Sequence, residues 1–271
     1  MTFKFKTFAA VGALIGSLAL AGCGQEDKNP NHIKVGVIVG SELKVAEVAK
    51  QVAKDKYGLD VELVTFNDYV LPNEALSKGN IDVNAFQHKP YLDQQMKERG
   101  YKLTVVGNTF VYPIAAYSKK IKTMDELQDG AQIAIPNDPT NMGRSLLLLQ
   151  KQGLLKLKDG VGLMPTPLDI IENPRNFKIV ELEAPQLPRA LDDNQITLAI
   201  INTAYSSQIG LTPTKDGIFV EDKESPYVNI IVSREDNKDS EAVKKFVQAF
   251  HSDEVAQAAN VEFKGGAIKG W

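Results

Sequence analysis

The chain has 271 residues, of which 43% are hydrophobic and 24% charged, with a formal net charge of −3 and one cysteine. These proportions are typical of a globular protein, and the mild acidity argues against a nucleic-acid partner, which would require a clustered basic face. A single cysteine excludes an intrachain disulfide, so packing alone must hold the fold together.

The first 22 residues predict a secretion signal. Lys4 and Lys6 form a short basic region, and an apolar stretch of about fifteen residues follows from Phe8. That stretch is too short for a spanning helix with ordinary flanks. It ends in the letters LAGC at Cys23, which resemble the lipobox of bacterial lipoproteins. Cys23 would then be the mature N-terminus and carry the lipid. The alternative is an ordinary signal peptide with an incidental cysteine.

The segment 23–31 is interpreted as a lipidated tether, because residues 25–31 are polar and end in Asn-Pro-Asn. From Ile33 onward the chain alternates between strands and helices. A β-rich run at 33–39, a helix from Ser41 and a strand at 59–66 predict a parallel β-α-β unit with a right-handed crossover. Ser41 is the expected helix cap.

The same alternation continues to the C-terminus and predicts an α/β architecture. Further helices are expected near 73–78, 90–99, 140–152, 240–250 and 252–260, with a short helix capped by Thr123. Further strands are expected at 81–86, 103–106, 131–136, 178–182, 197–201 and 227–232.

An internal repeat suggests two lobes of similar topology. Ala75-Leu76 followed by a strand at 81–86 aligns, at a shift of 115, with Ala190-Leu191 followed by a strand at 196–201. Ligands of open α/β sheets bind beyond the carboxyl ends of strands. Residues 86–88 and 202–205 would therefore face each other across a cleft.

The most specific segment is 135–144, where two prolines fix a turn between a strand and a helix. With Thr140 or Asn141 near its cap, the helix would offer free N–H groups and its positive dipole end to an anion. Arg144 lies one turn in and could bind a carboxylate at two points. The alternative is an ordinary cap with Arg144 as a solvated surface charge.

Aromatic side chains in the first half could wall an apolar pocket, although each could instead belong to the core. They are Tyr69, Phe86, Tyr91, Phe110 and Tyr112, with His88 among them. Asn229 lies inside an apolar strand, where its amide must find partners at a lobe crossover or on a ligand.

Metal and enzyme chemistry are not expected. His32, His88 and His251 have no short ligand spacing, and the chain contains no nucleophile elbow, zinc-protease motif or Walker loop. The paired carboxylates at 192–193 and 221–222 are interpreted as solvated turns. An exported hydrolase built from dispersed residues, or a lipoprotein acting through surface contacts, is the alternative from another class.

Several segments resemble the NlpA family of substrate-binding lipoproteins for ABC importers. They are the lipobox, 66–69, 85–91, 136–144 and 226–229, and the similarity runs to Trp271. The resemblance implies a two-lobed periplasmic-binding-protein fold of type II-like topology, with lobes at 32–111 plus 229–271 and at 112–228. It also implies a monomer without cofactor or catalysis that carries methionine to an ABC permease and its ATPase.

By the same resemblance, Arg144 and Asn141 would take the ligand carboxylate, and Asn202 and Asn229 would fix the amino-acid backbone. The thioether would be enclosed by Tyr69, Phe86, His88 and Tyr91, since sulfur against an aromatic face is favourable. Family members also bind related amino acids or peptides, so another such ligand is the alternative.

Closure around the ligand would be a hinge motion near 111–112 and 226–229. The chain would be anchored to the cell membrane through Cys23 and face the periplasm. Gly24 stands where similar enteric lipoproteins carry an aspartate for inner-membrane retention, yet an importer favours the inner membrane.

Overall fold

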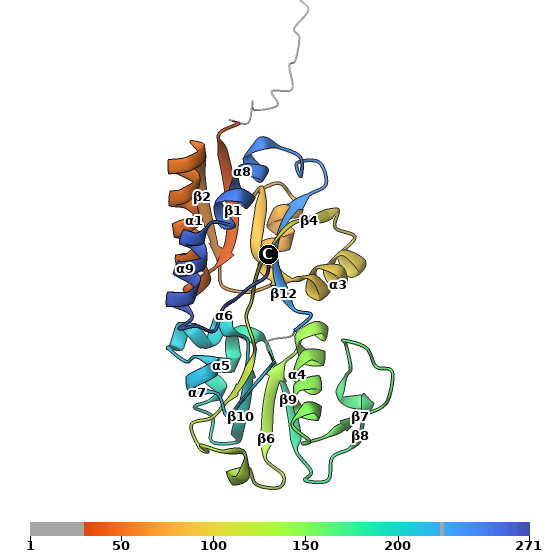
Figure 1. Ribbon diagram of the computed structural model, residues 1–271. Coiled ribbons are helices and arrows are strands. Elements are labelled where there is room, and N and C mark those ends of the chain that lie inside the picture. The colour runs from red at the N-terminus through yellow and green to blue at the C-terminus, as the bar shows by residue number, and fades with distance from the viewer. Residues whose placement is uncertain (1–29, 223–224) are drawn as a thin grey trace, which may run out of the picture.

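The computed structural model describes residues 30–222 and 225–271. Cys23, the predicted signal 1–22 and most of the predicted tether 23–31 lie outside the described residues. Figure 1 shows two bodies stacked along one axis, each built on its own sheet. We call the body with the six-stranded sheet the first lobe and the body with the five-stranded sheet the second lobe.

The first lobe contains a mixed sheet in the order β13-β4-β12-β3-β1-β2. β1 pairs in parallel with β2 and β3, whereas β12 runs antiparallel between β3 and β4. Its strands are β1 (His32–Ile38), β2 (Asp60–Phe66), β3 (Val83–His88), β4 (Leu103–Val111), β12 (Val228–Arg234) and β13 (Ile268–Lys269). Its helices are α1 (Ser41–Tyr57), α2 (Leu71–Ser77), α3 (Lys89–Arg99), α8 (Glu241–Phe250) and α9 (Asp253–Glu262).

The second lobe contains the sheet β11-β5-β10-β6-β9, with a small β7-β8 ribbon beside it. Its strands are β5 (Ala115–Tyr117), β6 (Gln132–Pro136), β9 (Lys178–Leu182), β10 (Ile196–Ile201), β11 (Phe219–Val220), β7 (Lys156–Leu157) and β8 (Ile170–Glu172). Its α-helices are α4 (Pro139–Lys151), α5 (Leu187–Ala190), α6 (Thr203–Ser206) and α7 (Pro213–Asp216). Separate apolar clusters cover the two faces of this sheet.

The first β-α-β unit forms as the sequence predicts. α1 buries Val45, Ala49 and Val52 on one side, packs against α8 and α9, and ends at Gly58, whose φ of 60° is the left-handed conformation that glycine adopts readily. The predicted cap at Ser41 is wrong: Gly40 is the N-cap, and no side chain caps the helix.

Other differences lie at strand ends and in short elements. β4 runs five residues past its predicted end, because its far end pairs with both β12 and β13. β5, β11 and β13 were not predicted, since strands of two or three residues carry no readable alternation. Thr123 precedes a 3-10 turn but makes no capping hydrogen bond with its side chain.

The chain passes between the lobes after β4 and again before β12. The chain therefore moves from one sheet to the other near the lobe boundaries expected from the sequence. The exact domain boundaries stay a prediction. The two segments aligned as an internal repeat form β3 and β10, and each is an interior strand of its sheet.

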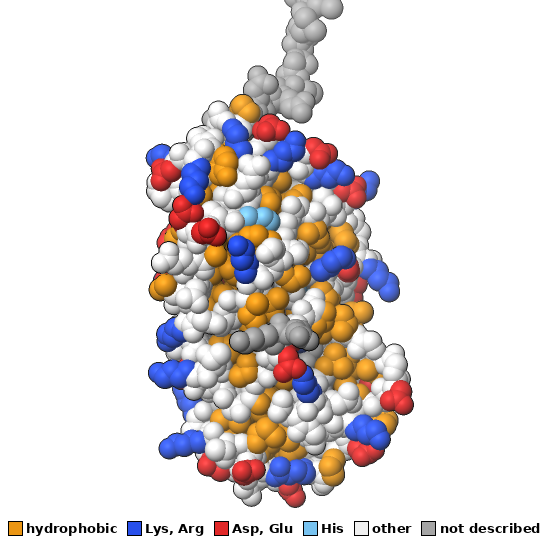
Figure 2. Space-filling model, in the orientation of Figure 1, with side chains coloured by type: hydrophobic (Ala, Val, Ile, Leu, Met, Phe, Trp, Pro, Cys, Tyr) orange, Lys and Arg blue, Asp and Glu red, His pale blue; other side chains and the backbone are white. Residues whose placement is uncertain are grey.

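Basic and acidic side chains are interspersed on the face seen in Figure 2, without a broad field of one sign. No helix within residues 30–222 and 225–271 has the length and apolar character to cross a membrane.

Candidate ligand-binding site

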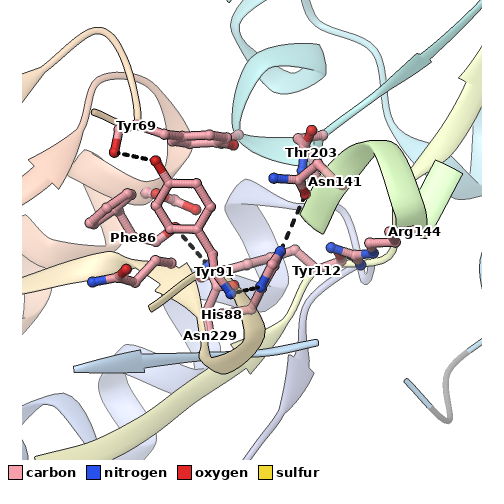
Figure 3. A pocket seen from close by; sticks show the side chains of 13 residues that line it. Tyr69, Phe86, His88, Tyr91, Tyr112, Asn141, Arg144, Thr203 and Asn229 are labelled. Carbon is pink, nitrogen blue, oxygen red and sulfur yellow. Dashed lines mark hydrogen bonds between the residues drawn. The ribbon is translucent and has the colours of Figure 1, made fainter. Parts of the chain in front are cut away.

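A pocket of about 360 Å³, including the part open to solvent, is lined by residues from both lobes (Figure 3). All eight site residues predicted from the sequence line it: Tyr69, Phe86, His88, Tyr91, Asn141, Arg144, Asn202 and Asn229. The lining also includes Gln87, Thr203 and Ala204 from the two segments expected at the cleft, and Tyr112 from the predicted aromatic group. Glu42 lines the pocket as well and was not predicted there.

Three aromatic rings of the first lobe form one wall. The ring centroids of Tyr69 and Phe86 are 5.8 Å apart, and that of Tyr91 lies about equally far from both, at 6.1 and 6.2 Å. These spacings suit tilted and edge-on aromatic contacts. The Tyr91 hydroxyl donates to the backbone carbonyl of Tyr69 at 2.9 Å, which fixes the wall. Phe110, expected in the same cluster, instead packs in the core against Phe250 and Trp271.

His88 connects the two lobes. It is the N-cap of α3, where its Nδ1 accepts the Tyr91 backbone N–H at 3.1 Å. Because Nδ1 accepts, the proton of the neutral ring is on Nε2, which donates to Asn141 Oδ1 at 3.2 Å across the lobe boundary. Burial, with the positive charge of Arg144, lowers the pKa of His88 to about 3, so the ring is neutral at physiological pH.

The cap of α4 differs from the prediction. Asp138, and not Thr140 or Asn141, is the N-cap, and its carboxylate accepts from the Asn141 backbone N–H at 3.0 Å and the Thr140 hydroxyl at 2.9 Å. This carboxylate occupies the capping position at the end of the helix where an external anion was expected. An anion at that helix end stays a prediction.

Asn141 and Asn202 join the cap to the pocket. Asn141 Oδ1 also accepts from Asn202 Nδ2 at 2.8 Å, and Asn141 Nδ2 donates to both oxygens of Asp138 at 2.9 and 3.0 Å. The Asn141 amide is therefore held by protein partners. Its contact with a ligand carboxylate stays a prediction, and that contact would require one of these bonds to change.

Arg144 is buried, with 3% of its surface exposed, so the surface-charge alternative is wrong. Its Nε donates to Glu221 Oε1 at 2.8 Å, and its second terminal nitrogen, NH2, donates to Glu221 Oε2 and to the Tyr112 carbonyl at 3.0 Å. The guanidinium also lies 4.4 Å from the centre of the Tyr227 ring. Within the described residues these hydrogen bonds involve Nε and NH2, and none involves NH1.

Glu221 corrects another expectation. Its side chain is 14% exposed and forms the bidentate partner of Arg144, so it is not a solvated turn carboxylate. The neighbouring Asp222 does pair with an exposed lysine, Lys151. The sequence of two adjacent carboxylates could not show which of them is buried, because the burial of Glu221 depends on its tertiary contact with α4.

Two acceptor oxygens in the pocket lack partners. Glu42 Oε2 and Asn202 Oδ1 are buried and make no hydrogen bond in the described structure. Burial raises the pKa of the Glu42 carboxyl to about 8. By contrast, Asn229 donates to the Phe86 carbonyl at 3.1 Å, and Gln87 is bonded to Asn73 and Asn84.

A sequence signal for Glu42 exists. α1 begins just beyond the carboxyl end of β1, where ligands of α/β sheets bind, and Glu42 falls on its buried face with Val45, Ala46 and Ala49. An acidic residue at an apolar position of a helix face is the unusual feature.

No group of three His, Cys, Asp or Glu side chains in the described ranges is placed to hold a metal ion. The lining of the pocket includes one buried guanidinium, one carboxyl, one neutral imidazole, several amides and aromatic rings.

Comparison with known proteins identifies the family. The family model described as NlpA lipoprotein matches residues 33–271. Over all 271 residues of both proteins, the chain is 82% identical to the D-methionine-binding lipoprotein MetQ of Escherichia coli K12.

Solved structures agree with this assignment. The crystal structure of the methionine binding protein MetQ matches with a TM-score of 0.89 and 81% identity, over 90% of this chain and 99% of that one. A nutrient binding protein from Burkholderia cenocepacia bound to methionine matches with a TM-score of 0.85 and 49% identity, over 88% and 100% of the two chains. The predicted two-lobed α/β fold is confirmed. The chain belongs to the NlpA lipoprotein family, as its motifs predicted.

Proposed function

We propose that this chain is a lipid-anchored substrate-binding protein that holds L- or D-methionine in the pocket between its lobes and delivers it to an ABC importer. The observation that carries the proposal is a small pocket combining the free NH1 of a buried arginine with an aromatic wall. The relative named D-methionine-binding lipoprotein and the relative solved with methionine support the choice of ligand.

The proposed binding mode follows from these groups. The ligand carboxylate accepts from Arg144 NH1, with Asn141 nearby, and the amides of Asn202 and Asn229 hold the backbone of the amino acid. The thioether lies against the aromatic wall, where each sulfur contact with a ring contributes about 0.3–1.5 kcal/mol.

Delivery is proposed to depend on the lipid anchor. Cleavage after residue 22 would leave Cys23 as the lipidated N-terminus, and the tether would keep the receptor at high effective concentration near the permease and its ATPase. In this proposal the protein acts as a monomer without a cofactor. The lobes, at 32–111 plus 229–271 and at 112–228, close on the ligand about the two crossovers.

Calorimetric titration tests the ligand. The purified chain is titrated with L-methionine, D-methionine, alanine and glutamate, and both methionines are expected to bind most tightly. If methionine binds no better than alanine or glutamate, the proposed ligand is wrong.

Arg144→Ala tests the binding mode. A charge-assisted hydrogen bond is worth about 1.5–3 kcal/mol, so methionine affinity should fall roughly 10- to 100-fold. Arg189→Ala is the matched control, because Arg189 is exposed on α5 and does not line the pocket. Equal affinities of the two variants would remove Arg144 from the ligand contacts.

A further inference from the structure

Glu42 has no role in the proposed binding mode, yet its side chain lines the pocket. The residue is 7% exposed, and its Oε2 is buried without a hydrogen-bond partner in the described structure. Asn202 Oδ1, in the same pocket, is also buried without a partner. Leaving a buried polar atom unsatisfied costs about 1–3 kcal/mol, so two in one pocket indicate a missing group.

Asn202 Oδ1 is an acceptor, and Glu42 Oε2 is one once the carboxyl is ionised, so a single donor group would satisfy both. A carboxyl in a buried site also favours a cation, because an opposite charge offsets the cost of removing an ionised carboxylate from water. Arg144, the cation of this pocket, is already paired with Glu221. In the described residues no lysine, arginine or histidine forms an ion pair with Glu42. The pocket itself therefore supplies no counter-charge to this carboxyl.

We propose that Glu42, together with Asn202, binds the ammonium group of an α-amino acid and loses its proton when the ligand binds. The inference rests on the proposed function, in which the ligand ammonium group has no charged partner, and it assigns Glu42 as that partner. The Glu42 proton passes to solvent, while the ligand keeps its three ammonium protons. The complex then contains a carboxylate and an ammonium ion in contact, and the ligand carboxylate lies apart, at Arg144.

The surroundings of Glu42 allow this proton to be counted. The phenols of Tyr69, Tyr112 and Tyr205 interact with Glu42, and burial raises their pKa values, so they are neutral near pH 7. His88 is neutral too, because its pKa is lowered to about 3. Because burial raises the Glu42 pKa to about 8, most of the carboxyl carries a proton at pH 7.

Calorimetry on the unmodified protein tests proton release. L-methionine is titrated at pH 7 in two buffers of different ionisation enthalpy, and the slope of observed heat against that enthalpy gives the number of protons released. We expect a net release of protons at pH 6 and pH 7 that becomes smaller as the pH rises to 8 and above. Binding heats that are independent of the buffer at all three pH values would overturn the proposal.

A variant tests which part of the ligand Glu42 contacts. Glu42→Gln keeps the shape of the side chain but cannot ionise when the ligand binds. It should bind L-methionine roughly 10- to 100-fold more weakly and release no proton. Binding of the desamino analogue 4-(methylthio)butanoate should change far less. Glu47→Gln, on the exposed face of the same helix, is the matched control and should leave both affinities unchanged.

The outcomes separate the two proposals. Equal losses for methionine and its desamino analogue, or no loss for either, would show that Glu42 does not contact the ammonium group. If the unmodified protein binds no α-amino acid at all, the proposed function itself fails. Circular dichroism reports whether Glu42→Gln is folded; if it is not, the proton count on the unmodified protein decides alone.

Discussion

Glu42→Gln should change how the stability of the ligand-free protein depends on pH. The carboxyl has a pKa of 4.5 when exposed and about 8 when buried in the folded protein. Between these values the folded state binds more protons than the unfolded state, so the free energy of unfolding falls as pH rises. Each pH unit in that interval corresponds to about 1.36 kcal/mol, which sets a ceiling of about 5 kcal/mol for the whole effect.

Glutamine does not titrate, so the variant lacks this loss of stability. The variant should match the parent near pH 4.5 and become more stable than it by up to about 5 kcal/mol at pH 8. His88 acts in the opposite direction, because its pKa is lowered from 6.5 to about 3 and its contribution is lost as pH falls below 6.5. The two slopes oppose each other between pH 4.5 and 6.5 in the parent, but His88 cancels in the difference between variants.

The assay is urea unfolding followed by circular dichroism at half-unit steps from pH 5 to pH 9, with no ligand present. Glu47→Gln, on the exposed face of the same helix, serves as the control for the same chemical substitution. A Glu42→Gln difference that is the same at pH 5 and pH 8 would refute the assignment of Glu42 as a buried carboxyl without a counter-charge.

Two further variants test the second lobe. Glu221→Gln leaves the buried Arg144 guanidinium without a charged partner and should lower the free energy of unfolding by about 3 kcal/mol. Glu172→Gln is the control, because Glu172 belongs to an exposed ion pair and its loss should cost less than about 1 kcal/mol. Equal urea midpoints for the two variants would contradict this prediction. Gly143→Ala would gain about 0.8–1 kcal/mol from helix propensity, but its Cβ would lie 2.4 Å from the Leu163 carbonyl oxygen. We therefore expect the Tm of the variant to fall. A rise in Tm would show that the loop 161–165 moves to make room for the methyl group.

The sequence was most informative where local pattern and site coincide. β1, α1 and β2 follow from period-two and helical spacing, and the end of β3 follows from the rule that ligands lie beyond strand ends. The segment from Pro136 to Arg144 was recognised as a strand, turn and helix because its prolines and polar residues act locally. The position of Arg144 in the pocket required the family resemblance, because a helix pattern alone does not separate a buried arginine from an exposed one.

What the sequence left open depends on contacts between distant segments. Glu221 is buried because α4 places Arg144 beside it, 77 residues earlier in the chain. Asp138 caps α4 although Thr140 and Asn141 are also capping types, and only the backbone geometry selects among them. Phe110 and Tyr112 are two residues apart on one stretch of chain, yet Phe110 enters the core and Tyr112 reaches the pocket, at the point where the chain leaves the first lobe.

The charges of the pocket, taken together, suit a zwitterion. Arg144 and Glu221 neutralise each other, His88 is neutral, and Glu42 is mostly protonated at pH 7, so the empty pocket has almost no net charge. An anion such as a desamino acid would find Arg144 NH1 but would offer no donor to Asn202 Oδ1 and no counter-charge to an ionised Glu42. A simple amine would satisfy those acceptors but leave NH1 without an acceptor. Only a ligand with both a carboxylate and an ammonium group pairs Arg144 NH1 and the acceptors Glu42 and Asn202 at once. A buried polar group left unpaired costs more free energy than a paired one gains, so the pocket would discriminate against a ligand that lacks either charged group.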